Sequence, residues 1–390
     1  MVMNKMSYLN EAKELLGELV EWRRYLHKNP EIGFDLPNTS KFVKDKLIEF
    51  GYEPRNLLEH GLIAEVGQGE KTILLRADMD GLPIKEESGL DFASKNDYSH
   101  TCGHDIHTTI MLGVAKLMKE HEDKLDGVVR FEFQPAEELL IGSEAMVDAG
   151  LLDGVDVAMA AHVQPMAPAS IMFKEGASLA AANNYRIKVK GVGAHGAMPH
   201  NGVDPVFIAS EIISASQTLI AREIPFAESA AITTGGFDSS GSRNVIPNEV
   251  ILEGTLRTFS EKTRAYLKER LPELAEGIAQ AYRGETEFEF LSDVPVLENN
   301  PELTRSVRQY AEDVLEGEYD VTEFEPMQAS EDFAVVSQKV PTTYFFIGMN
   351  PEGETPYPVH HPKVVFNEDM MAPAVAVFLT SAINWLKENK

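Results

Sequence analysis

Acidic residues, histidines and the only cysteine of this 390-residue chain gather in a few short stretches. The densest of them reads Thr101-Cys102-Gly103-His104-Asp105-Ile106-His107. A thiolate and an imidazole two residues apart can reach one metal ion from a loop that enters a helix, and these donors suit zinc, cobalt, manganese or nickel to differing degrees. The helix N-terminus is also expected to favour the thiolate form of Cys102. A lone cysteine is more often a small buried hydrophobe, so its role depends on the other stretches.

Two pairs of acidic residues follow predicted strands. Asp78 and Asp80 lie on the same side of an extended segment, because side chains alternate with a period of two. They could bind metal, orient ligating histidines or cap a turn. Glu137 and Glu138 precede the apolar Leu139-Leu140-Ile141, although adjacent acids normally lie on a solvated surface. The favoured interpretation is that one glutamate binds metal and the other acts as general base on metal-bound water.

Histidines at two further places could complete a metal centre. His162 follows the apolar stretch 155–161, where a histidine is more often an ordinary hydrogen-bonded residue than a ligand. His360 and His361 lie in a proline-rich segment near the C-terminus, and adjacent histidines seldom both bind metal. Together with the cysteine and the acids, they predict two divalent metal ions beside an unligated carboxylate, which is machinery for hydrolysis.

The elements that must position these residues alternate between helices and apolar strands. They are predicted at 11–28, 40–50, 61–66, 72–76, 106–121, 128–133, 143–149 and 155–161. Such alternation indicates an α/β layer with a mainly parallel sheet. Ligands of these sheets bind outside the carboxyl ends of the strands, so Asp78, Glu137 and His162 are expected at one edge.

The pattern changes near residue 183 to the order β-α-β-β-α-β, the split-βαβ or ferredoxin-like arrangement. These elements are predicted at 185–190, 204–222, 230–234, 249–259, 261–282 and 285–291. After Pro295 the α/β character returns, with helices at 301–315, 331–338 and 368–389 and a strand at 342–347. The predicted fold class is therefore α/β, with a discontinuous domain at 1–182 plus 294–390 and an inserted domain at 183–293.

Composition argues against several classes of partner. A formal net charge of −27 would repel nucleic-acid phosphates. The N-terminus lacks an apolar region with a cleavage site, and no apolar run approaches the ~20 residues of a membrane span. One cysteine cannot form an internal disulfide, which fits a reducing compartment. We therefore expect a cytoplasmic protein with no nucleic-acid or membrane partner.

Eight motifs follow one another along almost the whole chain. They are Trp22 to Glu31, Leu75 to Pro83, Cys102 to His107, Gln134 to Glu138, His195, Arg243 to Pro247, Ser330 to Phe333 and His360-His361-Pro362. In these motifs the chain resembles the M20 metallopeptidase/amidohydrolase family, specifically the branch of hippurate hydrolases and auxin-conjugate hydrolases. The resemblance implies a dimetal-hydrolase domain with an inserted lid or dimerisation domain. It also implies metal-dependent hydrolysis of the amide bond of small N-acyl amino acids or amino-acid conjugates.

The resemblance implies individual roles as well. Two divalent metal ions (Mn, Zn, Co or Ni) would be bound by Cys102, His104, Glu138, His162 and His360. Glu137 would be the general base, and Asp80 would support the metal site. His195 would contact the substrate carbonyl, in the wider family often across a dimer interface, and Asn244 and Arg257 would bind substrate.

Several alternatives remain open at this point. The wider family has His-x-Asp where this chain has Asp78-Met79-Asp80, and a bridging Asp where it has Cys102. Related enzymes with the same machinery include an N-acetyl- or N-succinyl-diaminopimelate deacylase and a dipeptide exopeptidase. A non-catalytic binding protein on the same fold is the alternative from another class. A homodimer through the inserted domain is expected as well.

Overall fold

The computed structural model describes residues 6–351, 353 and 356–390, and the chain divides into two compact units. The first unit extends to Gly176 and continues with Glu298–Glu325 and Asp332–Lys390. The second comprises Ala177–Leu297 and Pro326–Glu331. The chain therefore leaves the first unit and returns to it, as expected for an insertion.

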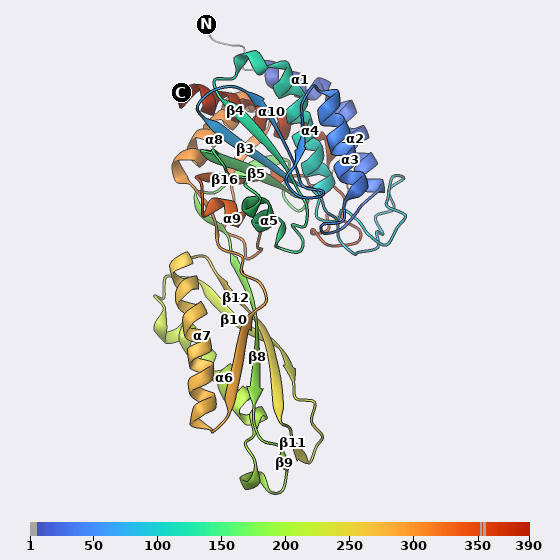
Figure 1. Cartoon of the computed structure of the whole chain (residues 1–390). Helices are drawn as coiled ribbons and strands as arrows, with labels where there is room; N and C mark the ends of the chain where they lie inside the picture. Colours follow the sequence, from blue (N-terminus) through green and yellow to red (C-terminus); the bar gives the residue numbers. More distant parts are fainter. Residues whose placement is uncertain (1–5, 352, 354–355) are drawn as a thin grey trace. The chain divides into compact units, whose positions relative to one another are not determined.

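An eight-stranded sheet forms the centre of the first unit (Figure 1), in the order β1-β2-β4-β3-β5-β16-β6-β15. Its strands are β1 (Arg55–Asn56), β2 (Leu62–Gly67), β3 (Thr72–Asp78), β4 (Val128–Gln134), β5 (Val157–Gln164), β6 (Ser170–Phe173), β15 (Asp320–Glu323) and β16 (Thr342–Gly348). The four central strands β4, β3, β5 and β16 run parallel. Antiparallel pairing occurs only towards the edges of the described sheet, at β1–β2, β2–β4 and β16–β6.

Burial explains why the central strands read as continuous apolar runs. Every residue of β3 is buried, as expected for a parallel strand covered on both faces. In the pairing of β3 with β4, Asp78 lies opposite Gln134. The carboxyl ends of β3, β4 and β5 therefore reach the same edge of the sheet, which confirms the predicted α/β class.

Helices cover this sheet. They are α1 (Met6–Glu14), α2 (Leu16–Lys28), α3 (Pro37–Glu49), α4 (His104–Glu120), η1 (Glu122–Lys124), α5 (Gly142–Asp148), α8 (Pro301–Leu315), α9 (Ala334–Ser337), η4 (Glu368–Met370) and α10 (Met371–Glu388). Helix α10 packs against α8, α4 and α1. With η4 it is long and apolar enough to cross a membrane, but 89% of its most apolar stretch is buried inside the protein, as in a core helix.

Some predicted elements differ from those in the structure. The helix predicted at 11–28 is two helices, α1 and α2, separated at Leu15. Gly17, a residue of low helix propensity, follows this break. The helix predicted at 331–338 is limited to α9. The short strands β6 and β15 were not predicted, since four residues carry too little periodicity.

The second unit follows the order β8-α6-β10-β12-α7-β13, with its main sheet arranged β10-β12-β8-β13 and every neighbouring pair antiparallel. Its elements are β8 (Ala181–Lys190), β9 (Ala194–His195), η2 (Pro199–Asn201), α6 (Pro205–Thr218), η3 (Leu219–Glu223), β10 (Ala230–Asp238), β11 (Val245–Ile246), β12 (Glu249–Thr258), α7 (Glu261–Ala281) and β13 (Glu285–Phe290). The chain passes between the units at β7 (Gly176–Leu179) and β14 (Leu297–Asn299), and again on either side of Pro326–Glu331. This is the ferredoxin-like arrangement that the pattern predicted.

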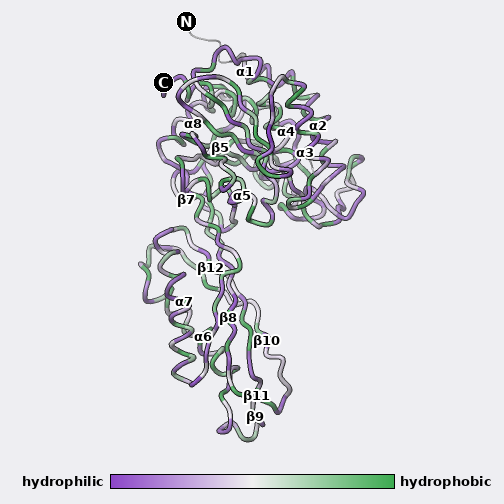
Figure 2. Tube along the Cα trace, in the orientation of Figure 1, coloured by the Kyte–Doolittle hydropathy of each residue, from purple (hydrophilic) through white to green (hydrophobic). Residues whose placement is uncertain are grey.

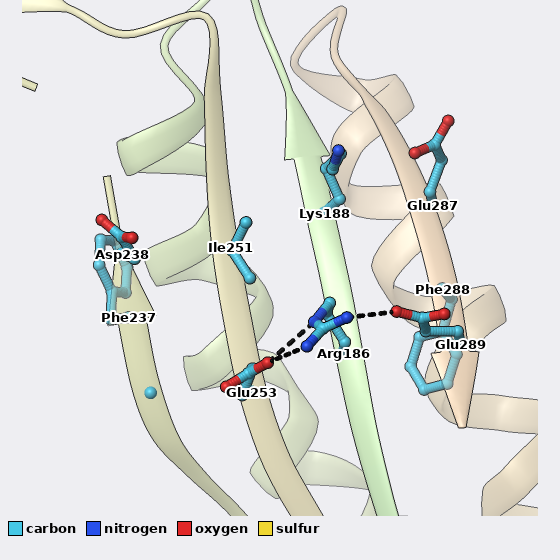
Figure 3. Close-up of a pocket in the computed structure, with 10 residues that line it drawn as sticks. Arg186, Lys188, Phe237, Asp238, Ile251, Glu253, Glu287, Phe288 and Glu289 are labelled. Atoms are coloured by element: carbon cyan, nitrogen blue, oxygen red, sulfur yellow. Dashed lines mark hydrogen bonds and ion pairs between the residues drawn. The ribbon is translucent and has the colours of Figure 1, made fainter. Parts of the chain in front are cut away.

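Alternation separates the two faces of this second sheet. From Asn183 to the end of β8, buried residues recur at every second position, and hydrophobic and hydrophilic colours alternate along this part of the chain in Figure 2. One face packs on α6 and α7. The other carries Arg186, which pairs with Glu253 on one side and Glu289 on the other (Figure 3). A cavity of about 530 Å³ lies on this charged face.

Candidate metal centre

All five predicted ligands converge at the carboxyl edge of the first unit's sheet. Donor atoms of Cys102, His104 and His162 lie within 4.8 Å of one another, and so do those of Cys102, Glu138 and His360. Cys102 Sγ lies 3.3 Å from Nε2 of His162 and 3.3 Å from Nε2 of His360. Cys102 thus belongs to both groups of donors.

Gly103 makes this convergence possible. It caps the N-terminus of α4 with φ of +98°, in the left-handed region that favours glycine. A Cβ there would lie 2.3 Å from Cγ2 of Val163. The chain can therefore direct Cys102 and His104 to the same place only because the residue between them has no side chain.

His104 is surrounded by carboxylates. Its Nδ1 lies 3.5 Å from Asp80, and its Nε2 lies 3.7 Å from Asp78 and 3.8 Å from both Glu137 and Glu138. Within the described residues, neither ring nitrogen has a hydrogen-bond partner. Burial alone would lower the pKa of His104, but Asp78 and the other carboxylates raise it to about 10. A buried imidazole without a hydrogen bond beside four acids fits the surroundings of a bound cation.

The electrostatics of Cys102 lead to the same conclusion. Burial raises the pKa of its thiol, and the carboxylates of Glu138 and Glu137 raise it further. Without a cation, burial and these carboxylates outweigh any preference of the helix N-terminus for the thiolate. A divalent cation among the same groups would reverse the balance and deprotonate the thiol. Thiol, imidazole and carboxylate together are a donor set that suits the transition metals predicted above.

Asp78 and His107 form a hydrogen-bonded pair beside the predicted ligands. His107 Nδ1 lies 2.6 Å from Asp78 Oδ1, and its Nε2 accepts the backbone N–H of Val163 at 2.9 Å. Arg76 donates to the other oxygen of Asp78 at 2.8 Å. Both ring nitrogens of His107 already have hydrogen-bond partners. We therefore do not assign His107 as a metal ligand, although it belongs to the same motif as Cys102 and His104.

Asp80 holds the two adjacent glutamates through their backbone. Its oxygens accept the N–H groups of Glu137 at 3.0 Å and Glu138 at 3.2 Å. Ala136, the residue before them, has φ of +59°, a strained value for a residue with a side chain. The bend and the two bonds to Asp80 turn the glutamates towards His104.

The structure distinguishes the two adjacent histidines. His360 Nε2 lies 3.3 Å from Cys102 and 3.5 Å from Glu138. The ring of His361 stacks on Tyr357, with 4.3 Å between centroids. A backbone φ of +64° at His360 accompanies this separation. His360 is therefore the member of the pair that faces the donors.

Residues of the second unit form a separate group. His195 on β9 is exposed, and its Nδ1 accepts the N–H of Ala197 at 3.1 Å, so its Nε2 is left to donate. The carbonyl of Asn244 accepts the N–H of Gly196 at 2.7 Å, which places Asn244 beside His195. Arg257 lies near the far end of β12, and among the described residues its buried Nη1 has no hydrogen-bond partner.

Arg257 is therefore distant from His195 within one chain. The β9 segment follows β8, whose last residue, Lys190, pairs with Glu249 at the start of β12. The eight residue-to-residue steps from Glu249 to Arg257 span roughly 27 Å at ~3.4 Å per step. The structure brings His195 and Asn244 together and separates both from Arg257.

A buried cluster outside the predicted site residues holds the start of α4. Asp105, next to His104, accepts from Arg23 Nε at 2.8 Å and lies 2.8 Å from His27 Nδ1. His27 Nε2 lies 3.0 Å from Glu86. Arg23 and His27 belong to a motif used only for the resemblance, and no local signal connects them with Asp105.

Comparison with known proteins identifies the family. Residues 74–384 match the sequence model of peptidase family M20/M25/M40, and the chain belongs to this family. It is 36% identical over 378 residues to an N-acetyl-L-cysteine deacetylase of Bacillus subtilis strain 168, which covers 96% of this chain and 89% of the relative. It is 33% identical over 389 residues to a hippurate hydrolase of Campylobacter jejuni, covering 98% of this chain and 100% of the relative.

A solved structure agrees with this assignment. The Bacillus subtilis YXEP protein, described as a dinuclear metal binding peptidase from the M20 family, superposes with a TM-score of 0.84. It is 32% identical and covers 96% of this chain and 99% of its own. The chain is accordingly a metal-dependent amidohydrolase or peptidase in class, as the motifs predicted.

Proposed function

We propose that this protein hydrolyses the amide bond of small N-acyl amino acids with two divalent metal ions. The observation that carries the proposal is the convergence of Cys102, His104, Glu138, His162 and His360, with Glu137 beside them. The relatives named above, a deacetylase of N-acetyl-L-cysteine and a hippurate hydrolase, support the substrate class.

The donor groups suggest how two ions would be held. Cys102 is common to a group with His104 and His162 and to a group with Glu138 and His360, so its thiolate is placed to be shared. Once bound, the ions would polarise the substrate carbonyl and lower the pKa of water. Manganese, zinc, cobalt and nickel are all compatible with this mixed donor set.

Glu137 is proposed as the general base. Its carboxylate lies 3.8 Å from His104, and its backbone is held by Asp80. It would take a proton from the attacking water and later deliver it to the leaving amine. Proton transfer of this kind contributes roughly 10²–10⁴ in rate.

The second unit is proposed to bind the substrate. His195 would donate a hydrogen bond from Nε2 to the oxyanion, Asn244 would assist it, and Arg257 would pair with the substrate carboxylate. A small N-acyl amino acid cannot span the roughly 27 Å between the β9 end of the sheet and Arg257. This separation supports a homodimer in which His195 and Arg257 of one active site come from different chains. We also propose that the protein acts in the cytoplasm.

The test is a hydrolysis screen on metal-free protein. After removal of metal with a chelator, the protein is reloaded singly with manganese, zinc, cobalt or nickel and assayed on N-acetyl and N-benzoyl amino acids. We expect turnover with at least one metal and none in the chelated protein. Metal binding without turnover of any acylated or peptide substrate would instead indicate a binding protein.

The same screen separates the related activities. N-acetyl- and N-succinyl-diaminopimelate test the diamino-acid deacylase, and dipeptides with a free α-amino group test the exopeptidase. A preference for either of these over acylated monoamino acids would replace the proposed substrate class while leaving the metal centre in place.

A further inference from the structure

One buried carboxylate holds both ends of the loop that carries the adjacent glutamates, residues 135–142. The two oxygens of Asp332 accept hydrogen bonds from Nε2 of Gln134, at 2.9 Å each, and Oδ2 also accepts the backbone N–H of Ser143 at 2.9 Å. Gln134 is the last residue of β4, and Ser143 lies in the first turn of α5. The loop therefore begins and ends on the side chain of Asp332.

The same carboxylate is connected to the supports of the metal centre. Arg76 donates from Nη2 to Asp332 at 3.1 Å, from Nη1 to Asp78 at 2.8 Å and from Nε to Gln134 at 2.9 Å. Arg76, Asp78 and Asp332 are all buried. Buried charges are tolerated only when their partners are held in good geometry, so this arrangement constrains the residues around it.

The bonds of Asp332 indicate that it positions other residues and does not itself bind metal. A carboxylate oxygen of Asp332 lies within 4.8 Å of one of Glu137. Its oxygens already accept from a side-chain amide, a guanidinium and a backbone N–H. To bind a cation, Asp332 would have to give up the bonds that hold the loop.

We propose that Asp332 is a positioning residue for the reaction, which acts by fixing loop 135–142 from both ends. Asp80 fixes the middle of the same loop through the backbone of Glu137 and Glu138. With three points fixed, the loop presents one glutamate to the metal donors and the other to the substrate. The effect on turnover rests on the proposed function, whereas the effect on the loop itself does not.

The test variant is Asp332→Asn, which keeps the size of the side chain and replaces one accepting oxygen with a donor. We expect kcat at saturating metal to fall about 10- to 100-fold, as for other partners that orient a metal site, with KM changed much less. We also expect amide hydrogen exchange across 135–142 to accelerate about tenfold, since opening that segment costs less once it is held at fewer points. The exchange measurement needs no substrate, so it tests the proposal even if the proposed function fails.

The matched control is Asp156→Asn. Asp156 also accepts a backbone N–H, from Thr72 at 2.8 Å, and a lysine, from Lys71 at 2.8 Å, but at the opposite end of β3. It should leave both kcat and the exchange of 135–142 unchanged. If both variants lower kcat equally, or if Asp332→Asn leaves the exchange of the loop unaltered, the proposal is overturned.

A double variant distinguishes the proposed role of Asp332 from a general loss of folding. In the pair Asp332→Asn with Gln134→Glu, the carboxylate and the amide exchange places, so the total charge is kept and an amide–carboxylate bond can form again. We expect kcat of the pair to be at least about fivefold higher than kcat of Asp332→Asn, and exchange of the loop to be slower than in that variant. The reason is that the effects of substitutions at two contacting residues are not independent. A pair as impaired as the single variant would contradict the proposed role.

Discussion

The candidate metal centre and the β9–β11 pair of the second unit hold their chemically important side chains in opposite ways. His104 is fully buried, with carboxylates around it and a glycine cap before it. His195 is exposed on a two-residue strand, where its Nδ1 accepts a hydrogen bond from Ala197. The first site is shaped before any ligand arrives, whereas the second leaves a donor facing solvent.

Under the proposed function, this difference follows from what each site would bind. Metal donors must be held at fixed distances from one another, so they are buried and supported by further hydrogen bonds. An exposed donor such as His195 can be held in its final place once substrate and the partner subunit surround it in the proposed complex. Changes in the first region should therefore alter metal content and stability as well as turnover, whereas changes in the second should alter turnover alone.

Glu137→Gln should have the largest effect on turnover. Unlike other changes in the first region, it should leave metal content and stability unchanged. The amide keeps the shape of the side chain, and the bond to Asp80 is made by the backbone, so fold and metal content should be kept. Loss of the base should lower kcat by about 10²–10⁴. Steady-state kinetics with metal analysis test this, and Glu144→Gln on the exposed face of α5 is the control. Unchanged turnover in Glu137→Gln would remove this residue as the base.

His195→Ala should have the next largest effect on turnover. If His195 is the proposed oxyanion donor, its loss should lower kcat by roughly 10²–10³. Metal content and melting temperature should stay at the wild-type values, because His195 is exposed and is not one of the proposed metal ligands. The neighbouring exposed His200 provides the control, His200→Ala. If His195→Ala retains full kcat, the β9–β11 pair does not take part in the reaction.

Gly103→Ala should disturb the first region by geometry alone. The left-handed φ costs about 1–2 kcal/mol for a residue with a Cβ, and the new methyl group would also meet Val163 at 2.3 Å. Gly89→Ala separates the two effects, because Gly89 also has a positive φ but no atom within 4 Å of its added Cβ. Both variants should lose stability in denaturant unfolding, and only Gly103→Ala should bind metal more weakly. Equal metal affinity in both would show that the close approach to Val163 is not needed.

Much of the first region could be predicted because its residues follow strands that sequence makes visible. The apolar run of β3 marks a buried strand, and parallel strands direct their carboxyl ends to one edge, so Asp78 and Glu137 had to approach each other. The order of the second unit was equally visible in alternating strands and amphipathic helices. These are local patterns with a physical period.

The supports of the site could not be predicted in the same way. Asp332 meets Gln134 across 198 positions of sequence, and Asp105 meets His27 across 78. Nothing local marks either pairing, because hydrogen bonds of this kind depend on packing that brings distant segments together. The choice of His360 over His361 depends likewise on a single backbone turn with positive φ. Residue type indicates which chemistry is available, and the tertiary structure decides which of two neighbouring residues of the same type faces the site.

The smallest effect should come from the cluster behind the metal centre and should depend on pH. Burial and Arg23 act to lower the pKa of His27, but Asp105 and Glu86 more than compensate, and the pKa is raised above 6.5. A raised pKa in the folded state means that the stabilisation is fully present below pH 6.5 and is lost as pH rises through the folded value. The surface pairs around Arg186 in the second unit should contribute little at any pH (Figure 3).

His27→Gln should therefore destabilise the protein more at pH 6 than at pH 9. The size of that difference reports how far the folded state raises the pKa of His27. Thermal or denaturant unfolding of the wild type and the variant across this range measures it, with exposed His200→Gln as the control. A loss of stability that is the same at pH 6 and pH 9 would mean that His27 contributes by packing and neutral hydrogen bonds. In that case the charge of the cluster would not help to hold the start of α4.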